Sequence, residues 1–108
     1  METATILRGF FSAIEKDPRI SVSHIGLYVT LVSLCQSQGE TGCLEIFGKD
    51  VMLASKISST ATYIKLLHEL IDFRYLHYEP SYYKRKASRI SIAGIQDHVQ
   101  PYLNHYAN

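Results

Sequence analysis

The sequence predicts a mainly helical α+β domain with a small antiparallel β-hairpin. Apolar residues recur three and four positions apart in several segments, which predicts helices because such residues share one helix face. Two short segments, residues 75–79 and 89–92, instead alternate with period two, which is typical of half-buried strands. The stretch between them contains Pro80 and a basic cluster, as expected of a hairpin loop. A chain of 108 residues fits one domain with a modest core.

Two helices are expected in the first part of the chain. The first spans about residues 5–16 and ends before Pro18, because proline cannot continue a helix. The second has the body HIGLYVTLVSLCQSQ, and either Ser21 or Ser23 can cap its start. Its apolar residues lie on two faces, so we expect a central helix packed from both sides. The residues concerned are Ile6, Leu7, Phe10, Phe11 and Ile14 in the first helix, and Ile25, Leu27, Tyr28, Leu31, Val32, Leu34 and Cys35 in the second.

Three further elements are expected between residues 39 and 73. The turn GETG is followed by residues 44–46, which are short enough for a single β bridge. A third helix is expected over residues 48–56 and a fourth over residues 60–73, TATYIKLLHELIDF, with the hydroxyls of KISST available to cap the fourth. The residues expected in the core are Val51, Met52 and Leu53 from the third helix, and Tyr63 or Ile64, Leu67, Leu70 and Ile71 from the fourth.

Basic residues are concentrated near the end of the chain, although the formal net charge is only +1. Residues 1–73 hold six Lys or Arg against eight Asp or Glu, whereas residues 74–108 hold five against two. Four of those five lie between Lys84 and Arg89, in the expected hairpin. Such a cluster creates a local positive potential that the total charge conceals, so it predicts contact with an anionic partner.

The expected order of helices and strands, together with short sequence segments, resembles that of a known family. The stretch DVMLASKISSTATYIKLLHELIDFRYLHYEPS resembles the helix-turn-helix and first wing strand of winged-helix DNA-binding proteins. Together with SHIGLYVTL, the segments SKISSTATYIKLLHEL and YLHYEPSY are similar to small winged-helix regulators of Bacteroidetes and their mobile elements. The resemblance covers about residues 20–92, and it implies one winged-helix domain over residues 1–108 with flanking terminal helices.

The resemblance implies sequence-specific binding of double-stranded DNA, by a transcriptional regulator or an accessory factor of a mobile element. Because a helix fits the major groove and its first residues meet base edges, DNA contacts are expected from the start of the fourth helix and from the wing. The expected DNA-binding residues are Ser59, Thr60, Thr62 and Lys65 on that helix, and Arg74, Lys84, Arg85, Lys86 and Arg89 at the wing. A winged-helix module that binds protein instead of DNA stays open as the alternative, since the total charge is nearly neutral.

Arg74 departs from the family pattern, which usually has glycine at this helix end. Glycine is favoured there because it accepts a positive φ without a Cβ clash. Either Arg74 adopts that conformation at some cost, or the helix ends differently. Its charge lies near the base of the wing, where it can also reach a phosphate.

Several functional classes are not expected. The sequence has no nucleophile–base signature, phosphate-binding glycine loop or metal-ligand spacing, so we expect neither an enzyme nor a cofactor, and we identify no small-molecule ligand. No apolar stretch reaches a membrane span, and the first residues lack a basic leader. We therefore expect a cytoplasmic protein in which Cys35 and Cys43 are reduced.

Apolar surface outside the expected core predicts a homodimer. The first helix carries one apolar stripe, and the C-terminal segment carries another, which Pro101 kinks or divides into two short helices. One flanking helix suffices to close a winged-helix core, so one stripe is left to face a second copy, and a two-fold protein matches a two-fold operator. The alternative, that both stripes pack on their own core, stays open. The C-terminal stripe consists of Ile95, Val99, Tyr102, Leu103 and Tyr106.

Overall fold

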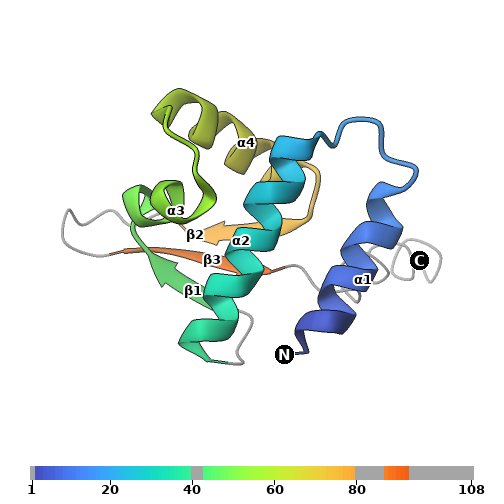
Figure 1. Ribbon diagram of the computed structural model, residues 1–108, viewed down its shortest axis with the longest axis horizontal. Helices are drawn as coiled ribbons and strands as arrows, with labels where there is room; N and C mark the ends of the chain where they lie inside the picture. The colour runs from blue at the N-terminus through green and yellow to red at the C-terminus, as the bar shows by residue number, and fades with distance from the viewer. Residues whose placement is uncertain (1, 40–42, 80–86, 93–108) are drawn as a thin grey trace, which may run out of the picture.

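The computed structural model describes residues 2–39, 43–79 and 87–92 (Figure 1). It is mainly helical with a small antiparallel sheet, which confirms the α+β class. The elements in chain order are α1 (Thr3–Ile14), α2 (Val22–Gln38), β1 (Cys43–Ile46), α3 (Gly48–Ser55), α4 (Thr60–Asp72), β2 (Leu76–Glu79) and β3 (Ser88–Ile92). The expected cations Lys84, Arg85 and Lys86, and the expected C-terminal helical segment, lie outside the described residues.

The three strands form an antiparallel sheet in the order β1-β3-β2. Ile90 in the central strand pairs with Leu44 of β1 on one side and Tyr78 of β2 on the other. The expectation of a single bridge at residues 44–46 was too small, because β1 is four residues long and pairs with β3 along its length. Ile90 and Ile92 are buried while Arg89 is exposed, so β3 alternates as its sequence predicts.

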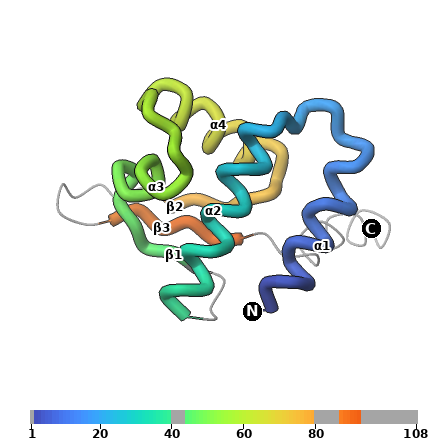
Figure 2. Tube along the Cα trace, in the orientation of Figure 1, coloured from blue at the N-terminus to red at the C-terminus, as the bar shows by residue number. Residues whose placement is uncertain are grey.

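Helix α2 is the central helix, as expected, and packs against α1, α3, α4 and β1 (Figures 1 and 2). Leu31, Val32 and Cys35 are fully buried. On the α1 side, the rings of Phe10 and Tyr28 stack with their centroids 3.7 Å apart. Apolar residues on two faces of α2 therefore serve two contacts, one with α1 and one with the sheet and the later helices.

Ser21, one of the two candidates, caps the start of α2. Its Oγ accepts from the backbone N–H of His24 at 3.4 Å, and its own N–H donates to His24 Nδ1 at 2.9 Å. Because Nδ1 accepts a hydrogen bond, the proton of the neutral ring lies on Nε2. That nitrogen lies 3.1 Å from Oε1 of Glu69 on α4, so buried His24 joins the start of α2 to α4.

The connection between α1 and α2 holds the end of α4. The Asp17 carboxylate accepts from Arg19 Nε and Nη2, each at 2.8 Å, and from the Tyr75 hydroxyl at 2.6 Å. These donors, Arg19 foremost, hold the pKa of the Asp17 carboxyl well below its usual range. The Arg19 guanidinium also lies 4.0 Å from the centroid of the Phe73 ring. Phe73 and Tyr75, which follow α4, are thereby joined to the connection between α1 and α2.

Candidate nucleic-acid interface

Helix α4 has one buried face and one polar outward face. Four residues at helical spacing are buried: Tyr63, Leu66, Leu67 and Leu70. Of the two candidates for the first core position, Tyr63 is buried and Ile64 is 48% exposed. Ile71 is only half-buried, and Leu66 is a core residue that the sequence interpretation missed. The opposite face carries Ala61, Lys65, His68 and Asp72, all exposed.

The start of α4 is capped and faces solvent. Ser59 is the N-cap, since its Oγ accepts from the backbone N–H of Thr62 at 3.2 Å. Thr60, Thr62 and Lys65 are exposed within the first two turns, where the helix dipole is positive. The structure thus brings together the four residues expected at this helix end, and their hydroxyl and ammonium groups can donate to phosphate or base oxygens.

A short connection that begins at Lys56 joins α3 to α4 (Figure 2). Lys56 has φ 65°, and Ile57 N–H bonds back to Met52 O at 3.1 Å, which closes the helix end. Among the residues expected in the core, Val51 is buried and Met52 half-buried, but Leu53 is 73% exposed, so its assignment to the core was wrong. The apolar run Val51-Met52-Leu53 points to three sides of the helix, so Val51 lies in the core, Met52 packs against it and Leu53 faces solvent.

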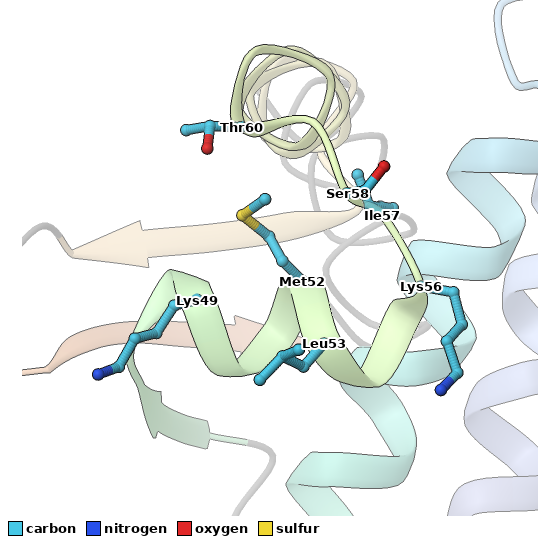
Figure 3. A pocket seen from close by; sticks show the side chains of 7 residues that line it. All are labelled: Lys49, Met52, Leu53, Lys56, Ile57, Ser58 and Thr60. Carbon is cyan, nitrogen blue, oxygen red and sulfur yellow. The ribbon is translucent and has the colours of Figure 1, made fainter.

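Two exposed lysines, one near each end of α3, were missed by the sequence interpretation. Lys49 lies in the first turn of α3 and Lys56 just after its last residue, and both line a pocket that Thr60 borders from the α4 side (Figure 3). Their spacing of seven residues is the signal that could have identified them, because it places two cations on one face of the helix expected over residues 48–56. In the structure α3 ends one residue before Lys56. With Lys65 they extend the positive charge of this surface from α4 to α3.

Arg74 adopts the left-handed conformation, the first of the two possibilities that the sequence left open. Its φ is 70°, its N–H bonds to Ile71 O at 3.0 Å, and Tyr75 N–H bonds to Leu70 O at 2.9 Å. This pair of bonds is a Schellman motif with arginine in the position that favours glycine. Arg74 lies at the opposite end of α4 from Thr60, roughly 20 Å away along the helix axis. The two residues therefore cannot contact the same phosphate.

Arg89 takes part in an ion pair across the sheet. Its Nη2 lies 2.9 Å from Oε1 of Glu45, the residue opposite it in the register of β1 and β3. Both side chains are about half exposed, so the pair contributes little to stability. A phosphate can replace Glu45 at low energetic cost, so the ion pair is compatible with the DNA contact expected of Arg89.

The described part of the chain limits other chemistry. Residues 2–39, 43–79 and 87–92 contain no group of three or more His, Cys, Asp or Glu placed to hold a metal ion. Within the same residues, no helix is both long and apolar enough to cross a membrane.

Burial raises the pKa of Tyr63 to about 12, which keeps this core phenol neutral.

The chain matches no protein-family model, no curated protein and no solved structure among those compared with it.

Proposed function

We propose that this chain is a winged-helix protein that binds double-stranded DNA sequence-specifically, as a transcriptional regulator or a mobile-element accessory factor. The single observation that carries the proposal is the start of α4. Thr60, Thr62 and Lys65 face solvent there, on a helix whose other face is held in the core. A helix supported in this way can enter a major groove with its first turns against the bases.

The arrangement around α4 supports the same function. Helix α3, a short turn and α4 follow one another in the order of a helix-turn-helix, and an antiparallel β2–β3 pair comes next in the chain, which supports a wing. Lys49 on α3, Lys56 after its end and Arg89 on β3 would then approach the DNA backbone on either side of α4. Lys84, Arg85 and Lys86 are proposed as further backbone contacts from the loop between the strands.

The test begins with selection of bound duplexes from a random-sequence pool, followed by fluorescence anisotropy on the selected site and on an unrelated duplex. For Thr60→Ala and Lys65→Ala we expect a loss of about 1–3 kcal/mol on the selected site and a smaller loss on the unrelated duplex. Thr62→Ala is expected to behave in the same way. Lys16→Ala is the matched control, because Lys16 is an exposed lysine beyond the end of α1. Equal losses on both duplexes would make these residues backbone contacts.

The proposed backbone contacts have a different signature. Replacing Lys84, Arg85 and Lys86 together by Ala should weaken binding about equally on all sequences and lower the salt slope by up to about three units. An unchanged salt slope would mean that these three residues do not contact the DNA phosphates. If the wild-type chain binds no duplex with a salt-dependent affinity, the DNA proposal fails and a protein-binding module takes its place.

We propose in addition that the chain pairs as a homodimer, through α1 and its C-terminal segment. Within α1, Phe10 is buried against Tyr28 and Tyr75, whereas neighbouring Phe11 is 46% exposed. Most of the α1 stripe is therefore used within the chain, and Phe11 is what it offers a partner. Sedimentation equilibrium at micromolar concentration tests the pairing. A single species at the 12.3 kDa of one chain would exclude the dimer and the expectation of a palindromic site.

A further inference from the structure

Helix α3 presents part of its apolar surface to solvent. Val51 is its one buried residue among the eight, while Met52 is half-buried and Leu53 is 73% exposed. Lys49, Met52 and Leu53 follow the spacing i, i+3, i+4 on α3, and Lys56, the left-handed residue just after the helix, borders the same pocket. Two apolar side chains thus lie between two cations, roughly 10 Å apart along the helix axis.

A groove runs along these four residues. Its far side is formed by Ile57 and Ser58 of the connection and by Thr60 at the start of α4, and its volume is about 670 Å³. Figure 3 shows Lys49 and Lys56 at the two ends of α3, with Met52 directed toward the α4 side and Leu53 beside it. The groove is therefore apolar in the middle and cationic at both ends.

We infer that this groove binds an amphiphilic organic anion, with an apolar body of medium length and a carboxylate at its end. Its volume lies within the usual range of small-molecule sites, which combine an apolar lining with a few polar groups. The apolar body would cover Met52, Leu53 and Ile57 and so remove exposed apolar surface from water. The carboxylate would pair with Lys49 or Lys56, because none of the described lining residues carries a carboxylate of its own.

Binding here also has a consequence for DNA, which rests on the proposed function. Thr60 is both a wall of the groove and a proposed base contact, and Lys49 and Lys56 are both its cations and proposed phosphate contacts. A molecule that occupies the groove would neutralise one of these cations and cover the approach to Thr60. It would therefore compete with the duplex.

The experiment is a methyl NMR titration of the full chain, without DNA, with octanoate, octylammonium and octyl glucoside. The three probes share one apolar tail and differ in the charge of the head group. We expect saturable shifts of the Met52, Leu53 and Ile57 methyl groups with octanoate, and affinity weaker by roughly tenfold or more for the cationic and neutral probes. Shifts of equal size and midpoint for all three probes would overturn the anion assignment.

Substitutions at exposed positions test the groove without destabilising the fold. The double change Lys49→Gln and Lys56→Gln should weaken octanoate by roughly tenfold, and Leu53→Gln should weaken all three probes. Lys16→Gln is the matched control and should change nothing. If probe binding depends on Phe11 and not on Leu53, the binding is adventitious and the groove is not the site. If the groove methyl groups shift with rising protein concentration before any probe is added, the groove binds a second copy instead.

A competition assay separates this inference from the proposed function. Octanoate should release the selected duplex over the concentrations that saturate the methyl shifts, and a duplex that stays bound would exclude the overlap. A chain that binds no duplex would defeat the proposed function while the titration still decides the groove. A titration without saturable shifts would defeat the groove, whatever the chain does with DNA.

Discussion

Helices α3 and α4 follow one another in the chain but are held in the fold by different means. Four residues of α4 are buried, whereas α3 has one, Val51. Side chains from α2 and from the α1–α2 connection reach α4 and its end, through the His24–Glu69 and Asp17–Tyr75 hydrogen bonds. In α3, the side-chain hydrogen bonds given by the described residues are local ones, such as Ser55 Oγ to Val51 O at 2.8 Å.

A small domain can therefore present two kinds of surface, one on a firmly held helix and one on a helix with little buried area. A helix that is fixed from behind can hold a row of polar groups, such as Thr62 and Lys65, in a constant position against a partner. A helix with little buried surface contributes less to stability and can expose Leu53 at small cost.

The largest effect is expected from truncating leucines on the two helices. Leu70→Ala should lower the free energy of unfolding by about 2–5 kcal/mol, because Leu70 is fully buried and a cavity would remain. Leu53→Ala, the same change on exposed α3, should alter it by less than about 0.5 kcal/mol. Urea denaturation of both variants measures the difference. Equal losses would mean that Leu53 is covered in solution.

The next effect concerns the anchor at the end of α4. Asp17→Asn should destabilise the chain at neutral pH by about 1–3 kcal/mol, because it weakens charge-assisted hydrogen bonds from Arg19 and Tyr75. Since the folded-state pKa of Asp17 is lowered, its contribution is present above the unfolded value of about 4 and declines as the pH falls. Thermal unfolding from pH 7 down to pH 2 should therefore show less acid dependence in the variant.

The exposed neighbour Glu15 provides the control, since Glu15→Gln should leave both the stability and its pH profile nearly unchanged. An acid dependence that Asp17→Asn leaves intact would assign the acid sensitivity to other carboxylates.

A smaller effect is expected at the start of α4. Ser59→Ala should cost about 1 kcal/mol of stability, because the N–H of Thr62 loses its acceptor, whereas Ser59→Gly should cost only a few tenths. The glycine variant keeps most of the cap energy but removes the hydroxyl. If its DNA affinity falls while its stability holds, Ser59 contacts DNA in addition to capping. If both are unchanged, Ser59 is a cap and nothing more.

The smallest effect is expected at the two left-handed helix ends, Lys56 and Arg74. Arg74→Gly and Lys56→Gly should each raise stability by up to about 1 kcal/mol, because relief of the Cβ clash outweighs the added chain entropy of glycine. The two variants should differ in DNA binding only if one of the cations reaches the backbone. Calorimetry together with anisotropy checks both expectations, and a lower melting temperature would show that the lost side chain contributed more than the strain it caused.

The sequence by itself determined the local elements of this protein. Periodicity of 3.6 and of two marked four helices and the β2 and β3 strands, since these patterns state which side of an element is buried. Two-sided apolarity placed α2 at the centre, and the missing glycine marked Arg74 as a position with two possible conformations, of which the structure has the left-handed one. The group of residues at the start of α4 was also accessible to sequence analysis, because capping and exposure there depend on neighbours in the chain.

Only the tertiary structure decided which apolar residues have a partner and which charges are paired. It placed Leu53 outside and Tyr63 inside, inserted β3 between β1 and β2, and joined Glu45 to Arg89 across 44 positions of the chain. The groove beside α3 likewise exists only where the connection from Lys56 turns back toward α4. The physical reason is that hydrogen-bonded spacing along a helix or strand is a local property, whereas burial and ion pairing depend on the surface that another part of the chain brings into contact.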